Sequence, residues 1–477
     1  MLRKSWAGLL LVVLSLSACD GEGEERGYSV RRPAASPTSE TGPVIGLVGT
    51  MSGPSAWRGE DAFEGVDVAI QELNRTRRDT ELMLSLVGRD DRGDPELATE
   101  LVEELAASER TVGIVYAGPP EGLPAAEDAL DQAGIPAVLV LGDLYSARLL
   151  RPHLFQSSPP YLWQARRMAS YLLKDRRYRR VGILAEDTLM GETATDSTRS
   201  ALRDEGGRVT AVATYEPMVE DLTPQLQRLK REQVESIVFH GSPSAAALLF
   251  AELREMDASY VSTAEARTVG LSRRERRRDR GWRPQIAAFD ETINPLTATD
   301  AEIPAGTVAA DTYARGAHYL PVRSLESFRR AFRDWWDETP LGWQRRSYEA
   351  TLMLGWAARR SEPGTDIAKT LEGLTGQRMG GLDITFGPDD HTSAIPTTVG
   401  LWVVPRSGLN VTERDSLPEQ MPWVMLSRGF STSGERTDVL PQDWNALFEG
   451  SYRVNGPAPR VTSAAFGVAT SRRDPVH

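Results

Sequence analysis

The sequence predicts an α/β protein in which two parallel sheets follow one another along the chain. Short, unbroken apolar runs of strand length alternate with amphipathic segments of helical spacing. Strands that are apolar without alternation are typical of parallel sheets covered by helices on both faces. The alternation starts at Val44 and restarts after residue 157, which predicts two such arrays in series.

The first array begins with the apolar run "VIGLVG" (44–49), followed by the turn-prone stretch "TMSGPSAWRGE". A helix is expected over residues 61–73, because apolar side chains recur there at helical spacing. Asp94 is a residue type preferred at a helix N-cap, and Pro95 suits the first helical turn. The other expected elements are strands over 82–88, 111–118 and 135–143 and helices over 97–105 and 123–134.

The second array repeats this pattern. We expect helices over 163–173, 191–206 and 222–233 and strands over 180–187, 208–215 and 234–241. The basic run "RRERRRDRGWR" (273–283) suggests either a solvated insertion or a patch for nucleic acid or anionic lipid, and the acidic whole favours the insertion. Further on, aromatic side chains at helical spacing predict core packing: Phe328, Phe332, Trp335 and Trp336.

Cys19 is the only cysteine, and it ends an apolar run. Arg3 and Lys4 precede an apolar stretch over 6–16, which has the length of a signal-peptide core and is too short to span a bilayer. Leu16-Ser17-Ala18-Cys19 looks like a bacterial lipobox, in which the thiol is acylated. We therefore expect a signal peptide over 1–18 and a disordered tether over 19–42; the alternative is a core cysteine that happens to follow a leader.

Bulk composition and missing motifs narrow the function classes. The net charge of −12 and the pI near 5.2 argue against binding of nucleic acid. The chain has no phosphate loop, no Gly-x-Ser-x-Gly elbow and no His-Glu-x-x-His motif, and its five histidines are scattered singly. We therefore expect no catalytic residues, no metal site and no cofactor, and a protein that binds without turnover.

Several stretches carry a family resemblance when they are taken in order. "IGLVGTMSGPSAWRGEDAFEGVDVAIQELN" resembles the opening of the type I periplasmic binding proteins, in their leucine/isoleucine/valine-binding branch. "RDDRGDPELA" is similar to the second loop of that branch, and "VGILAEDTLMGE" to the start of its second lobe. "RRSYEATLMLGWAAR" and "MGGLDITFGPDD" resemble its late lobe-one helix and its closing strand. The resemblance runs from about Val44 to about Val404.

This resemblance implies two Rossmann-like lobes with parallel sheets, joined by three hinge crossings and closing around a small ligand. The expected boundaries place lobe 1 at 43–157 and 304–385, and lobe 2 at 158–303 and 386–405 with the basic insertion at about 260–283. A C-terminal extension is expected over 406–454 and a disordered tail over 455–477.

Ligands of open parallel sheets sit beyond the carboxyl ends of the strands, and the resemblance selects the same loops. The expected ligand-binding residues are Ser52, Trp57, Gly118, Glu121, Gly142, Asp143, Met190, Ser242, Asp290 and Glu291. Asp290, with Glu291 beside it, resembles the position that holds an amino group in the family. The third and fourth loops, "AGPPEGLP" and "VLVLGDLY", lack the family's serine and threonine hydroxyls, so leucine as the ligand does not carry over.

Three of the polar and aromatic side chains near these loops have a second interpretation. Trp57 either stacks on the ligand or plugs the seam between the lobes. Asp143 either meets a cation or caps the next turn. His240 fits a hydrogen-bonded loop histidine better than a ligand group.

The expected function is that of a bacterial lipoprotein held in the cell envelope, facing the periplasm or exterior. It would close on a small polar ligand, such as an amino acid or an amide, and present it to an ABC transporter permease. A ligand sensor of the same fold, or a degenerate envelope interaction module without a ligand, are the alternatives.

Overall fold

The structure is a computed structural model, and it describes most of the chain between residues 42 and 403. The described residues are 42–79, 81, 83–258, 282–293, 303–304, 306–311, 323–337, 340, 342–362, 364–379, 382–388, 390–393, 399–403 and 424–427. The predicted leader, Cys19, nearly all of the predicted tether and of the basic insertion, and the predicted tail lie outside the described residues.

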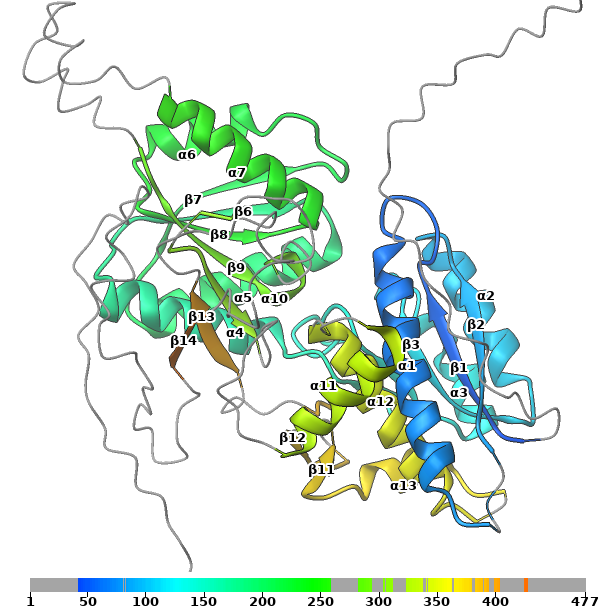
Figure 1. The fold of residues 1–477 in the computed structure, drawn as a ribbon. Coiled ribbons are helices and arrows are strands. Elements are labelled where there is room, and N and C mark those ends of the chain that lie inside the picture. Colours follow the sequence, from blue (N-terminus) through cyan, green and yellow to red (C-terminus); the bar gives the residue numbers. More distant parts are fainter. Residues whose placement is uncertain are drawn as a thin grey trace, which may run out of the picture. The chain divides into compact units, whose positions relative to one another are not determined.

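The first sheet has five strands in the order β2-β1-β3-β4-β5, and each pair of neighbouring strands is parallel. Strands β1, β2 and β3 are labelled in Figure 1. Its strands are β1 (Val44–Gly49), β2 (Ser85–Asp90), β3 (Thr111–Ala117), β4 (Ala137–Leu139) and β5 (Leu154–Gln156). Side chains from these strands alternate between two apolar clusters, one on each face, so both faces of the sheet are buried.

Helices from two parts of the chain cover this sheet. The helices from the first part are α1 (Trp57–Thr76), α2 (Pro95–Ala106) and α3 (Glu127–Ala133), and those from the later part are α11 (Arg323–Trp336), α12 (Gly342–Ala358) and α13 (Ile367–Glu372). Ile45 and Leu47 of β1 pack in the cluster that holds α1 and α12. Val48 points the other way, into the cluster that holds α2 and α3.

The second sheet has seven strands in the order β14-β13-β10-β9-β8-β6-β7. Its strands are β6 (Val181–Glu186), β7 (Val209–Tyr215), β8 (Ser236–His240), β9 (Gln285–Phe289), β10 (Val308–Asp311), β13 (Gly400–Val403) and β14 (Val424–Ser427). The first five pair in parallel, whereas β13 and β14 add an antiparallel edge.

Both faces of the second sheet are covered as well (Figure 1). Its helices are α4 (Tyr161–Ser170), which continues as a π-helical turn over Tyr171–Asp175, α5 (Leu189–Asp204), α6 (Thr223–Arg231), α7 (Pro243–Ala258) and the short α10 (Asp290–Ile293). Phe239 packs with α6 and α7, while Val238 packs with α4 and α5. The chain is therefore a mixed α/β protein with two lobes, each built on a mainly parallel sheet.

The chain passes between the two sheets three times. It leaves the first sheet after β5, returns after β10 to form α11, α12 and α13, and leaves again after the hairpin of β11 (Gln377–Met379) and β12 (Leu382–Ile384). This order makes the first lobe discontinuous in sequence.

The predicted lobe boundaries differ from the strand pairing at two points. Residues 308–311 form β10 of the second sheet, whereas the boundary at 303/304 assigned them to lobe 1. Phe386 packs in the core of the first lobe, and Thr392 bridges to Gln156 of β5, whereas the boundary at 385/386 assigned both to lobe 2. Both differences fall where the chain crosses from one sheet to the other. At these places a short apolar run does not indicate which of the two sheets it joins.

Other expectations can be compared directly. Asp94 is the N-cap of α2, as predicted, because its side chain accepts from the backbone N–H groups of Glu96 and Leu97. The aromatic stripe of α11 is only partly core, since Phe328 and Phe332 are buried but Trp335 is 38% exposed. Helix α1 begins four residues earlier than predicted, at Trp57. Among the described helices, none is long and apolar enough to cross a membrane.

Candidate ligand-binding site

The turn after β1 is built so that α1 starts close to the strand end. The Gly59 N–H donates to the Thr50 carbonyl over 2.8 Å. A Cβ on Gly59 would lie 2.6 Å from the same carbonyl oxygen, so glycine is the residue that permits this approach. The start of α1, with Trp57 and Arg58, is thereby held beside the carboxyl ends of the strands.

Trp57 packs mainly within the first lobe. Its ring lies 4.6 Å from that of Trp343 in α12, and the Arg58 guanidinium lies 5.5 Å from its centroid. Trp343 is fixed in turn by a hydrogen bond from its indole N–H to Asp61. One face of the Trp57 ring is therefore committed to aromatic packing within the first lobe.

Asp91, at the carboxyl end of β2, is fully buried. One of its carboxylate oxygens accepts from the Thr50 hydroxyl over 2.7 Å and from the Gly93 N–H over 2.8 Å. A Cβ on Gly118 would lie 2.2 Å from the other oxygen, so Gly118 lets the β3 loop close over this carboxylate. Burial raises the pKa of Asp91, and these two hydrogen bonds partly oppose that rise.

Asp143 has the geometry of a cap. Its carboxylate accepts from the backbone N–H of Ser146, from the Gln156 amide and from the backbone N–H of Tyr161. The last donor begins α4, so Asp143 ties the strand end of the first sheet to the first helix of the second lobe. Burial raises its pKa, and the donors oppose that rise. Of the two interpretations of Asp143, the geometry favours the cap.

The remaining loop residues serve different local roles. Gly142 has a positive φ of 95°, and a Cβ there would lie 2.4 Å from Pro120 and 3.6 Å from the Met190 sulfur. Gly142 and Met190, two expected ligand-binding residues, are thus close together. Ser242 accepts from the Ala245 N–H in the first turn of α7. Ser52 and Glu121 are exposed, each on its own loop.

Asp290 is neutralised by the protein itself. It forms an ion pair with Arg346 of α12, and both side chains are only 2% exposed. Gln164 of α4 donates its amide to the Asp290 carboxylate over 2.9 Å and accepts from the Asp290 N–H over 3.0 Å. Because these partners already compensate its charge, the Asp290 carboxylate is poorly suited to bind the amino group of a ligand. The sequence does not reveal the pair, because the two residues lie 56 positions apart.

Glu291 lies beside it in a second network. One of its oxygens accepts from the Tyr161 hydroxyl, and the other lies 3.4 Å from Arg58 Nη2. The His240 Nε2 atom is 3.1 Å from the Tyr161 oxygen. Burial lowers the pKa of His240 to about 4, so the imidazole is neutral at physiological pH. His240, the last residue of β8, is thus a buried, hydrogen-bonded histidine.

Glu186, the last residue of β6, was missed by the sequence reasoning. Burial raises the pKa of its carboxyl, Arg58 opposes that rise and Glu291 adds to it. Glu186, Arg58 and Glu291 therefore interact at the strand ends. Glu186 lies near the end of the predicted strand over 180–187, and this place at a strand end was the signal that could have found it. Arg58 lies in the turn-prone stretch "TMSGPSAWRGE" that follows the first predicted strand.

The arrangement at the strand ends suits recognition of charge. It combines an arginine, two glutamates, a buried tyrosine and a neutral histidine. Within the described ranges, no group of three or more His, Cys, Asp or Glu side chains could hold a metal ion.

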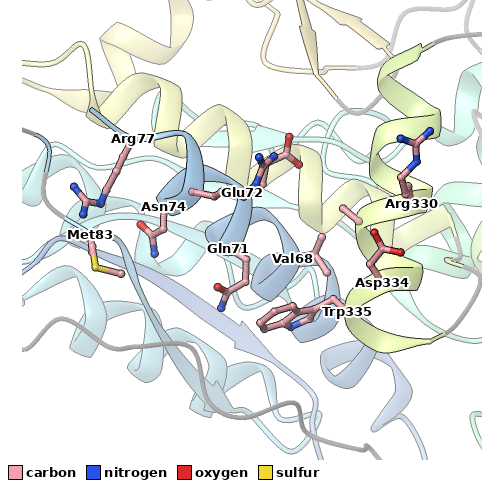
Figure 2. Close-up of a pocket in the computed structure, with 11 residues that line it drawn as sticks. Val68, Gln71, Glu72, Asn74, Arg77, Met83, Arg330, Asp334 and Trp335 are labelled. Atoms are coloured by element: carbon pink, nitrogen blue, oxygen red, sulfur yellow. The ribbon is translucent and has the colours of Figure 1, made fainter. Parts of the chain in front are cut away.

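A separate hollow of about 740 Å³ lies between α1 and α11 (Figure 2). Its wall includes Gln71 and Arg75 of α1 together with Arg330 and Trp335 of α11. These α1 residues belong to the half of the helix away from Arg58, about 20 Å along its axis. The hollow contains none of the expected ligand-binding residues, so it is distinct from the strand-end cluster.

A sequence profile of a family described as "Periplasmic binding protein" matches residues 43–402. Curated relatives include the Leu/Ile/Val-binding protein homolog 3 of Brucella melitensis biotype 1, 24% identical over 216 residues, which are 44% of this chain and 58% of the relative. The chain thus spans less than two thirds of that relative. BraC3 of Rhizobium johnstonii, a Leu/Ile/Val-binding protein, is 24% identical over 61% of this chain and 77% of its own length.

Solved structures share the fold. An ABC transporter substrate-binding protein from Sphaerobacter thermophilus has a TM-score of 0.60 at 18% identity, covering 84% of this chain and 97% of its own. LivJ from Streptococcus pneumoniae, solved in complex with isoleucine, has a TM-score of 0.60 at 16% identity, covering 76% and 95%. Identities this low show a common two-lobed architecture and leave the ligand open.

The Asp290–Arg346 pair yields a stability prediction. Arg346→Met leaves a buried carboxylate without its counter-ion and should lower the free energy of unfolding by about 3–5 kcal/mol. Adding Asp290→Asn removes the unpaired charge, so the double variant should be more stable than Arg346→Met alone. Urea unfolding followed by circular dichroism measures the wild type, the two single variants Arg346→Met and Asp290→Asn, and the double variant.

The exposed Arg89–Glu104 pair provides the matched control, because Arg89→Met should cost less than about 1 kcal/mol. A double variant that loses as much stability as the sum of its two single changes would contradict the assignment of a buried, mutually compensating pair.

Proposed function

Because the chain belongs to the periplasmic binding protein family, we propose that it is a solute-binding protein that closes its two lobes on a small polar ligand outside the cytoplasm. Family membership rests on the match over residues 43–402, and the two-lobed α/β fold agrees with it. The observation that carries the proposal is the cluster of polar groups from both lobes at the strand ends, where Arg58 of α1 meets Glu291 of α10.

Ligand binding in such a protein works through a shift in populations. A ligand that contacts both lobes stabilises the closed arrangement by as much as its affinity for that arrangement exceeds its affinity for the open one. The crossings after β5, β10 and β12 are where backbone rotation would accommodate the motion. No chemical step is needed, and we propose binding without turnover.

The proposed ligand is a small molecule with a positively charged amino group, such as an amino acid. The relatives' names point to leucine, isoleucine and valine, and the resemblance placed Asp290 as the amino-group partner. In this chain Arg346 already neutralises Asp290, so Glu186 and Glu291 are the carboxylates available to a cationic group. The specificity therefore differs from that of the branched-chain amino acid binders.

The proposed partners are an ABC transporter permease and the membrane. The permease would recognise the closed state, as in a transport role of this family. Anchoring is proposed through lipid on Cys19, because the lipobox-like run ends at the only cysteine of the chain. The protein would then work in the bacterial cell envelope, facing the periplasm or exterior.

A second candidate function is an envelope interaction module that binds no solute. The pairing of Asp290 with Arg346 and Gln164 favours this candidate. A carboxylate that binds the amino group of a ligand has to be accessible, and Asp290 is already paired within the protein. The two candidates differ in whether any small molecule stabilises the fold.

A thermal-shift screen of the full-length protein in mild detergent separates them. Amino acids, amides, amines, sugars and small carboxylates are each tested near 1 mM. A ligand at about a hundred times its Kd adds roughly 2.7 kcal/mol to the stability of the folded state. The proposal predicts a shift confined to compounds with an amino group. Cooperative melting with no shift for any compound would favour the envelope module.

The lipid anchor can be tested separately by metabolic labelling with radioactive palmitate. The wild-type protein should incorporate label, and Cys19→Ser should lose all of it because the acylated thiol is gone. Ser15→Ala, within the same apolar run, serves as the control and should stay labelled. Label that persists in Cys19→Ser would refute lipidation at this residue.

A further inference from the structure

One guanidinium faces several carboxylates at the strand ends of both sheets. Arg58 Nη2 lies 3.4 Å from Glu291 Oε2, and the two side chains are 22% and 8% exposed. Arg58 also opposes the rise in pKa that burial imposes on the carboxyls of Glu186 and Asp91. Three carboxyl groups therefore share the field of one cation.

The charge of this cluster is not balanced by its other contacts. Glu291 uses its second oxygen to accept from the Tyr161 hydroxyl, which is a neutral donor. For the Glu186 side chain, the described part of the chain shows no hydrogen bond or ion pair. Arg346 is committed to the neighbouring Asp290 and does not neutralise these groups. Glu186 and Glu291 are thus the carboxylates that most need a positive charge, since like charges repel in a partly buried site.

The surroundings of Arg58 suit a positively charged group that can be displaced and replaced by another. The guanidinium lies 5.5 Å from the centroid of the Trp57 ring, which itself packs at a tilt against Trp343. An aromatic ring together with carboxylates is a common environment for ammonium and guanidinium groups. Arg58 is on the first turn of α1, it is still partly exposed, and its distance of 3.4 Å to Glu291 is long for a charge-assisted hydrogen bond.

We propose that Arg58 is a built-in substitute for the cationic group of the ligand. Without ligand, its guanidinium compensates Glu291 and Glu186. A ligand with an ammonium or guanidinium group displaces it and takes over these carboxylates. A neutral or anionic solute cannot replace the lost positive charge, so the exchange selects cationic ligands. The identity of the ligand rests on the proposed function, but the need for a cation at this position does not.

Chemical rescue tests this position without knowledge of the ligand. Arg58→Ala removes the equivalent of ethylguanidinium, so that compound is the probe, applied at 10 mM to the full-length protein in mild detergent. Arg58→Ala should melt at a lower temperature than the wild type. With a Kd of about 1 mM, the probe should raise its melting temperature by about 2 °C. The melting temperature of the wild type should not rise, because its own Arg58 guanidinium already occupies this position.

The controls isolate the strand-end carboxylates. Arg89→Ala breaks an exposed pair with Glu104 in the same lobe and should show no rescue. Adding Glu291→Gln to Arg58→Ala should reduce the rescue, because one carboxylate is gone. Sodium chloride at equal ionic strength corrects for screening. A folded Arg58→Ala protein without rescue would overturn the proposal, and so would equal rescue of the wild type.

If Arg58→Ala does not melt cooperatively, Arg58→Met retains an apolar stem beside Trp57 and is tested with the guanidinium ion at 10 mM. Rescue supports the proposal, and its absence from a folded variant overturns it. For any amine found by the ligand screen, Arg58→Ala should bind at least about tenfold more tightly, because the internal competitor is removed. Unchanged or weaker binding overturns the substitute role. Failure of the screen counts against the proposed function alone, since the rescue result needs no natural ligand.

Discussion

The buried ion pair between Asp290 and Arg346 is the interaction on which the arrangement of the strand ends depends. It joins α10, at the end of β9 in the second sheet, to α12, which packs on the first sheet. Both side chains are nearly fully buried, so neither tolerates loss of the other. Gln164 adds hydrogen bonds to the Asp290 carboxylate and its backbone. This network fixes α4, α10 and α12 together and removes Asp290 from the set of free carboxylates.

In the proposed function, recognition of a ligand uses the carboxylates that remain. Glu291, one residue further, is reached by Tyr161 from its own lobe and by Arg58 from the other. Glu186 shares the same field at the end of β6. In the proposed function, Glu186 and Glu291 take the place of Asp290 as the carboxylates that hold the ligand's amino group, and Arg58 compensates them until a ligand binds.

Much of this architecture was predictable, because the rules behind it are local. Apolar runs of strand length indicated β1, β3, β6 and β8, and the Asp94-Pro95 pair indicated the start of α2. The side chains that pair with the carboxylates of the site could not be predicted from the sequence. The sequence analysis selected Asp290 and Glu291 by their place at a strand end and by the family resemblance, but Arg346 and Arg58 reach them only through tertiary packing. The boundary before β10 was placed too early for the same reason, since a short apolar strand does not specify its sheet.

The central claim, closure of two lobes on a ligand, is tested most directly by a distance measurement. Cys19 is the only cysteine, so two introduced cysteines in a Cys19→Ser background can be spin-labelled specifically. Glu103→Cys on α2 and Lys230→Cys on α6 place exposed labels on the two lobes, and Glu103→Cys with Lys369→Cys is the control within one lobe. The account predicts that binding of an amine shortens the mean distance between the labels on the two lobes and narrows its distribution. The label distance in the control pair should stay unchanged. Saturating binding with no change between the lobes would contradict it.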